Sequence, residues 1–95
     1  MSARVQGKIV AVRDNGNLVT DIDESRLVDA PRDERVLIRC DEHETTCIFD
    51  AVHNQPPATL IAVLGESGCL ELEVVGDSAR IMLGVGLGEG VEVSW

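Results

Sequence analysis

Apolar and polar residues alternate along the chain in short runs, which is the period of β-strands and not of helices. Turn residues bound each run, and the runs cover residues 5–12, 18–22, 35–40, 45–49, 59–64, 69–75 and 91–93. Between the first two runs, Asn15-Gly16 readily adopts the positive backbone angles of a tight hairpin. The pattern therefore predicts seven short strands, of which the first two form a hairpin.

The segments between the runs predict short helices and loops. Asp23 or Ser25 would cap a helical turn, and Asp77 or Ser78 would cap a helix over residues 79–83. Residues 41–44 are expected to form a charged loop, and residues 84–90 a glycine-rich loop that leads into the last strand. We predict a mainly β fold, a small seven-stranded closed or partly open β-barrel with one or two short helices.

The strand over residues 69–75 illustrates how the faces are assigned. Leu70, Leu72 and Val74 should point inward, while Glu71 and Glu73 between them should face water. The chain has 95 residues, so we expect a single domain over residues 1–95. With one Phe, one Trp and no Tyr, its core must be aliphatic, and few aromatic rings remain for stacking on a ligand.

Charge and cysteine content narrow the class of protein. The net charge of −9 argues against binding to nucleic acid or to an anionic membrane surface, since both need clustered Lys and Arg. The amino terminus lacks the apolar run of a signal peptide, and no run reaches transmembrane length. Three cysteines are an odd number, which argues against a secreted disulfide framework. We expect a cytoplasmic protein with reduced thiols.

Two segments carry a resemblance to a known family. Gly16-Asn-Leu-Val-Thr-Asp-Ile22 resembles the Phe-Gly-Asn-Leu-Ile-Thr-Asn-Ile stretch of the SAM hydroxide adenosyltransferases and their halogenase relatives. The second segment contains Ser67-Gly-Cys-Leu-Glu-Leu-Glu73, Gly76-Asp-Ser-Ala79 and Gly88-Glu-Gly-Val91, and it is similar to later blocks of the same family. Together these blocks span nearly the whole chain and match the family's C-terminal β-domain.

The resemblance implies an architecture as well as a fold. In that family a larger N-terminal domain precedes this one and supplies the residues that hold the ribose and position the attacking water or halide. The enzymes are trimers, with the adenosyl group between the N-terminal domain of one subunit and the C-terminal domain of its neighbour. A chain with the β-domain alone is then expected to form a homo-oligomer, such as a trimer, and not to be catalytic by itself.

The same resemblance nominates ligand-binding positions. Asn17 falls on an Asn that serves the nucleoside in the family, and Phe49 lies near an aromatic packed against adenine. Ser67 and Gly68 would present backbone groups to an adenine edge. Each has a purely structural alternative: Asn17 as a turn residue, Phe49 as core, and Ser67-Gly68 as an ordinary tight turn. Asn15 stands where the family has an aromatic, so the site is altered.

These observations leave three functional hypotheses. The first is a non-catalytic binding or assembly module with S-adenosylmethionine (SAM) or adenosine as a weak ligand and no other cofactor. The second is one half of a split SAM hydrolase, completed by a separate N-terminal-domain partner protein. The third is a small metal-binding protein that uses Cys40, His43 and Cys47, with His53 or Cys69 as a fourth ligand. Against the third, cysteines in strands usually behave as small hydrophobic residues.

Overall fold

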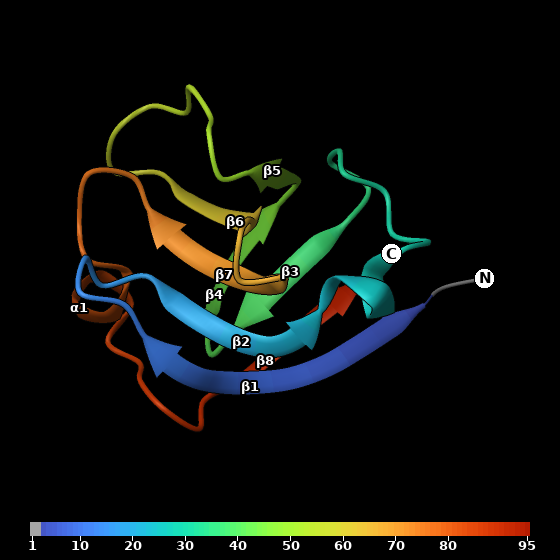
Figure 1. The fold of residues 1–95 in the computed structure, drawn as a ribbon, viewed down its shortest axis with the longest axis horizontal. Coiled ribbons are helices and arrows are strands. Elements are labelled where there is room, and N and C mark those ends of the chain that lie inside the picture. Colours follow the sequence, from blue (N-terminus) through green and yellow to red (C-terminus); the bar gives the residue numbers. More distant parts are fainter. Residues whose placement is uncertain (1–2) are drawn as a thin grey trace.

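The computed structural model describes residues 3–95, which form one eight-stranded sheet curled into a nearly closed barrel (Figure 1). The strands are β1 (Arg4–Val12), β2 (Leu18–Asp23), β3 (Leu37–Cys40), β4 (His43–Thr46), β5 (Ile48–Asp50), β6 (Leu60–Leu64), β7 (Cys69–Val74) and β8 (Gly90–Ser94). A 3-10 helix, η1 (Glu24–Leu27), and an α-helix, α1 (Ala79–Leu83), complete the fold. The strand order is β4-β3-β8-β1-β2-β7-β6-β5.

The barrel closes where the two ends of the sheet approach each other. Thr45 on β4 donates its hydroxyl to the backbone carbonyl of Leu60 on β6 at 2.8 Å. Neighbouring strands pair antiparallel except β5 and β6, which run parallel. The backbones of Ala3 and Trp95, the first and last described residues, hydrogen-bond to each other in both directions and so lie side by side.

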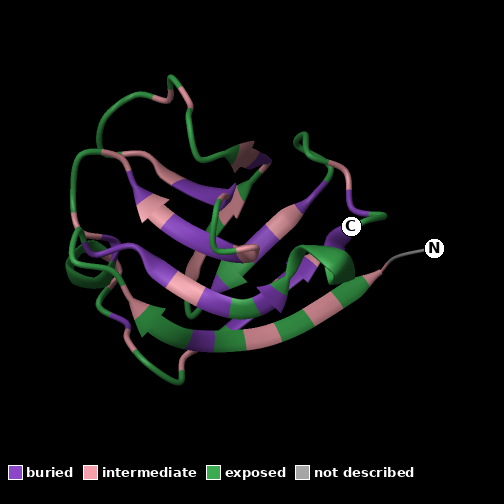
Figure 2. Ribbon diagram, in the orientation of Figure 1, coloured by how far each residue is buried: buried purple, intermediate pink, exposed green. Residues whose placement is uncertain are grey.

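The core is aliphatic, as the composition predicts. Leu70, Leu72 and Val74 are buried, and they pack with inward residues from the other strands. Figure 2 shows the resulting alternation of buried and exposed positions along the strands. The side chain of Trp95 is partly buried against the core.

Both predicted helical pieces are present, with the predicted type of cap. The Asp23 carboxylate accepts from the Ser25 backbone N–H at the start of η1, and the Ser78 hydroxyl accepts from the Ile81 N–H at the start of α1. The backbone N–H of Arg80 donates to the Gly16 carbonyl at 3.0 Å. Helix α1 is thereby fixed against the β1–β2 turn, at the left end of the barrel in Figure 1.

The prediction of seven strands is wrong by one, because the predicted strand 45–49 is two strands. Cys47 has a positive φ of 73° and breaks the run into β4 and β5, which pair with different neighbours. The predicted charged loop 41–44 is also too long, since β4 begins at His43. His43 and Glu44 belong to an edge strand with polar side chains, and such a strand shows no apolar alternation in the sequence.

Candidate functional site

The β1–β2 turn places two asparagines side by side at the end of the barrel. The Asn17 carbonyl accepts from the Arg13 N–H at 2.9 Å, and the Asn15 side-chain oxygen accepts from the Asn17 N–H at 3.0 Å. Gly16 lies between them with a φ of +92°, a conformation that favours glycine. These hydrogen bonds hold the backbone of the turn and the Asn15 side chain, and so fix the backbone position from which the Asn17 side chain extends.

Two adjoining hollows open beside this turn, over β7. Their volumes are about 430 Å³ and about 370 Å³, and both are lined by Asn15, Asn17 and Glu73. The first extends toward the cap of α1, where Asp77 and Ser78 line it. The second extends over β7 toward the β6–β7 turn and is also lined by Arg13, Ala51, Val63, Gly65, Glu66 and Glu71. We refer to the two together as the Asn17 pocket.

Among the polar residues that line this pocket, Asn17 is the least exposed of those whose side chains make no hydrogen bond within the described residues. The residue is only 9% exposed, and within residues 3–95 its side-chain amide makes no hydrogen bond. Among the described side chains, no polar atom is fully enclosed without a partner, so the Asn17 amide must reach the pocket. An amide that extends from a fixed backbone and has no protein partner offers both donor and acceptor groups to a ligand.

Glu71 forms the floor of the pocket and is buried, so the prediction that it faces water is wrong. It is only 5% exposed, because Arg13 lies over it and donates from Nε and Nη2 to the two carboxylate oxygens at 2.8 Å each. These hydrogen bonds hold the pKa of Glu71 below its ordinary value, against the opposing effect of burial. Arg13 and Glu71 are 58 residues apart, so no local signal in the sequence could pair them.

Glu73, the other acidic residue of β7, is held by a histidine from the segment between β5 and β6. His53 Nε2 lies 3.1 Å from Glu73 Oε2, and the Gln55 backbone N–H donates to His53 Nδ1 at 3.2 Å. Since Nδ1 accepts a hydrogen bond, we assign the proton of the neutral ring to Nε2, which then donates to Glu73. The segment 51–58 is thus tied to β7 at the edge of the pocket.

Of the four residues nominated from the sequence, only Asn17 lines the Asn17 pocket. The Ser67 hydroxyl accepts from the Cys69 N–H within its own turn, and the Gly68 N–H and carbonyl both bond to other backbone groups. Their neighbours Gly65 and Glu66, in the same turn, do line the pocket. A ligand role for Ser67 and Gly68 stays a prediction.

Phe49 lies elsewhere, in a separate hollow of about 440 Å³ lined by Arg32 and residues 48–50 and 52–55. It is half-buried and not part of the core cluster, so the structural alternative of a core position is wrong, and a ligand role for Phe49 stays a prediction. Its ring packs at a tilt against His53, with ring centroids 6.5 Å apart. Phe49 therefore contacts His53, which in turn contacts Glu73. Phe49 itself does not line the Asn17 pocket.

The predicted metal ligands do not come together in the part of the chain that the structure describes. Cys40 points into the core, and burial raises the pKa of its thiol to about 11. His43 Nε2 lies 3.0 Å from the backbone carbonyl of Leu83. Among the described residues, the one group close enough to share an ion is Asp41, Glu42 and His43, at the exposed β3–β4 turn. The cysteines are therefore not its ligands.

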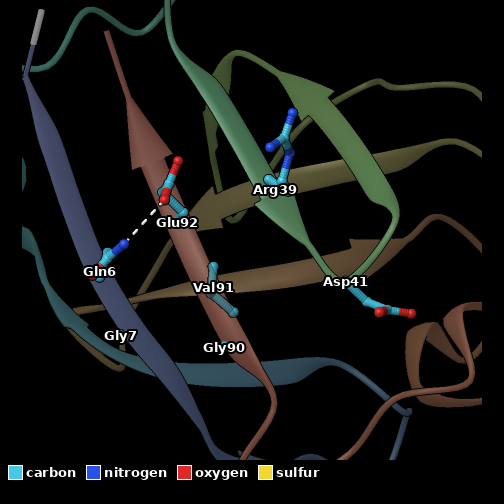
Figure 3. A pocket seen from close by; sticks show the side chains of 7 residues that line it. All are labelled: Gln6, Gly7, Arg39, Asp41, Gly90, Val91 and Glu92. Carbon is cyan, nitrogen blue, oxygen red and sulfur yellow. Dashed lines mark hydrogen bonds between the residues drawn. The ribbon is translucent and has the colours of Figure 1, made fainter.

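A further hollow of about 300 Å³ lies on the outer face of β1, β8 and β3, above Gly90 (Figure 3). Gln6, Glu92 and Arg39 form one row across these three strands. Their polar groups bond within the protein: Gln6 donates to Glu92 at 3.1 Å, and Arg39 pairs with Glu44. The hollow is open, and the side chains of Gln6, Glu92 and Arg39 already have partners.

The segment of this chain that matches a known protein family contains all of the residues that line the Asn17 pocket. Residues 7–92 match the family described as SAM hydroxide adenosyltransferase C-terminal domain. This chain belongs to that family. The match runs from β1 through the β1–β2 turn and β7 into β8, and so includes every strand that bounds the pocket.

Two solved structures share the fold of this SAM hydroxide adenosyltransferase C-terminal domain. One is an uncharacterised conserved protein from Thermotoga maritima, with a TM-score of 0.76 and 22% identity over 93% of this chain. The other is a conserved hypothetical protein from Thermus thermophilus, with a TM-score of 0.70 and 24% identity over 93% of this chain. The chain covers only 35% and 34% of their lengths, about one third. No curated protein matches the chain at a significant level.

Among the described residues, no helix has the length and apolar character needed to cross a membrane.

Proposed function

We propose that this domain is a non-catalytic binding and assembly module that takes an adenosine-type ligand in the Asn17 pocket. The observation that carries the proposal is the free amide of Asn17, 9% exposed and placed by a hydrogen-bonded turn at the opening of both hollows. Membership of the adenosyltransferase C-terminal domain family supports the ligand class. The resemblance of the Gly16–Ile22 segment to the family pattern also implies that Asn17 stands where the family has a nucleoside-contacting Asn.

The Asn17 pocket is polar and open, and both properties limit how tightly a single chain can bind a ligand there. Ligand sites that bind tightly enclose most of the ligand and are mainly apolar. Here carboxylates and amides line the walls, with Val63 and Ala51 among the few apolar contributions. A ligand in this pocket is therefore held weakly by one chain, and a second surface would have to cover it. We propose that a second copy of the chain, in a homo-oligomer such as a trimer, provides that cover.

Replacing Asn17 by alanine is expected to weaken the binding of adenosine and of SAM by about tenfold, since a lost hydrogen bond to a ligand costs about 1 kcal/mol or somewhat more. The backbone bonds of Asn17 do not involve its side chain, so the turn should persist. Isothermal titration calorimetry of the wild-type chain and the variant measures the change.

Asn54→Ala is the matched control, because Asn54 is exposed and lines the separate Phe49 hollow. It should leave the affinities unchanged. No heat from the wild-type chain at millimolar adenosine or SAM would remove the proposal. Multi-angle light scattering on the same samples reports the oligomer, and a monomer at all concentrations would remove the assembly part.

A second candidate is a SAM hydrolase completed by a separate N-terminal-domain protein, with this chain supplying only one side of the site. The observation that favours it is the length of the solved structures that share the fold, of which the chain covers about one third. The test mixes the purified chain with a purified N-terminal-domain protein and follows complex formation and the release of adenosine from SAM. If the two proteins fail to associate, this candidate is wrong.

A further inference from the structure

The charges around the Asn17 pocket are unbalanced. Four acidic residues line it: Glu66, Glu71, Glu73 and Asp77. Arg13 is the one basic residue among the lining side chains of the two hollows, and its Nε and Nη2 both bond to Glu71. With that pair neutralised, three carboxylates remain, and the potential inside the pocket is negative.

Acidic side chains on a surface are common, and here a second feature separates the pocket from an ordinary solvated face. Asn17 is nine-tenths buried and lines the same two hollows, and within residues 3–95 nothing bonds to its side-chain amide. Because no polar side-chain atom of the described residues is fully enclosed without a partner, the Asn17 amide opens into the pocket, where it is available to a bound molecule. A ligand that bonds to this amide would also meet the carboxylates.

Glu73 is the carboxylate best placed to meet that ligand. It lines both hollows, and its side chain is held from one direction by the His53 contact at Oε2. No described residue donates to its other oxygen, Oε1. Glu66, in contrast, is exposed on the β6–β7 turn and lines only one hollow. A carboxylate that is fixed on one side and free on the other accepts hydrogen bonds from a ligand without first losing side-chain freedom.

We infer that Glu73 is the specificity-determining residue of the Asn17 pocket and that His53 is its positioning residue. Glu73 selects a nucleoside that presents a protonated amine near the pocket and rejects one that presents a phosphate. This inference rests on the proposed function, because it names the chemical class that the nucleoside site accepts.

Three probes that share an adenosine body and differ in charge test the inference: 5′-amino-5′-deoxyadenosine, adenosine and AMP. Calorimetry of the wild-type chain should rank them in that order, with the amine at least about tenfold tighter than AMP, as expected for one charge-assisted hydrogen bond. In Glu73→Gln the preference of the amine over AMP should fall by about tenfold, while the affinity for neutral adenosine changes little.

Three further variants separate the effect of a positioned carboxylate from the effect of general charge. Glu66→Gln removes the same charge from the pocket edge and should reduce the amine preference far less than Glu73→Gln. His53→Ala should reduce the preference because Glu73 is no longer held, and His53→Gln, which keeps a side-chain N–H donor, should restore part of it. Thermal unfolding of every variant shows whether the fold persists.

The outcomes distinguish this inference from the proposed function. If adenosine binds but the amine and AMP bind equally, or AMP binds more tightly, the inference is wrong and the proposed function stands. An equal effect of Glu66→Gln and Glu73→Gln would likewise overturn the role of Glu73. If none of the three probes produces heat at millimolar concentration, the proposed function and the inference are both wrong.

Discussion

Gly16→Ala is expected to lower the free energy of unfolding by about 2–5 kcal/mol, from the added costs of backbone strain and overpacking. Gly16 has a φ of +92°, where an alanine is strained. An added Cβ would also overlap the Ser78 hydroxyl and lie 2.6 Å from the Ser78 Cα, so helix α1 would have to move. Urea unfolding followed by circular dichroism measures the loss.

Gly68→Ala is the matched control for the packing part of this loss. Gly68 also has a positive φ, of 76°, but a Cβ there would meet no heavy atom within 4 Å. Its substitution should cost only the strain of the left-handed backbone, about 1–2 kcal/mol. If Gly16→Ala costs no more than Gly68→Ala, the close contact between the β1–β2 turn and α1 does not constrain the fold. A stable Gly16→Ala chain that still binds adenosine normally would contradict the turn's role in placing Asn17.

The sequence predicted the elements whose signals are local. The hairpin at Asn15-Gly16 and the capped helix 79–83 depend on neighbouring residues, and both are present in the structure. The inward positions Leu70 and Leu72 follow from strand periodicity alone. The eighth strand was missed because β5 has only three residues, 48–50, and Cys47 adopts a positive φ without being glycine. Positive φ at such a residue has no sequence signal.

The candidate site was harder to predict, since its contacts join distant parts of the chain. Asn17 was nominated through the family resemblance, and the structure adds that its amide is enclosed and free. Glu71 and Glu73 on β7 were predicted to face water. The alternation of apolar and polar residues predicts which face of a sheet a side chain lies on, but it does not predict which other segments cover that face. Arg13 and the segment 51–58 cover it, and neither contact follows from spacing in the sequence.

Arg13→Met is expected to lower the free energy of unfolding at neutral pH by about 2 kcal/mol. Removing one partner of a buried ion pair costs about 3–5 kcal/mol, and the exposure of Arg13 to solvent reduces this to roughly half. In the variant, the Glu71 carboxylate stays on the floor of the pocket with its two hydrogen bonds from Arg13 lost. Urea unfolding at neutral pH measures the loss.

The loss should depend on pH in a defined direction. In the wild-type chain Arg13 holds the pKa of Glu71 below its unfolded value, so Glu71 stabilises the fold above about pH 4.3 and loses this contribution as the pH falls through its folded pKa. Without Arg13 the pKa of Glu71 rises, because its strongest lowering influence is lost while burial still opposes the charge, and protonation relieves the buried charge. The difference between the two chains should therefore be largest at neutral pH and shrink in acid, as the pH falls through the folded pKa of Glu71.

Two controls show whether the buried carboxylate causes this behaviour. Arg35→Met removes the same kind of side chain from an exposed pair with Asp33, and its effect at neutral pH should be smaller. Adding Glu71→Gln to Arg13→Met removes the unpaired charge and should recover part of the stability at neutral pH, with little change in acid. If the double variant recovers nothing, or if the Arg13→Met loss is the same at both pH values, Glu71 is not the residue that Arg13 stabilises.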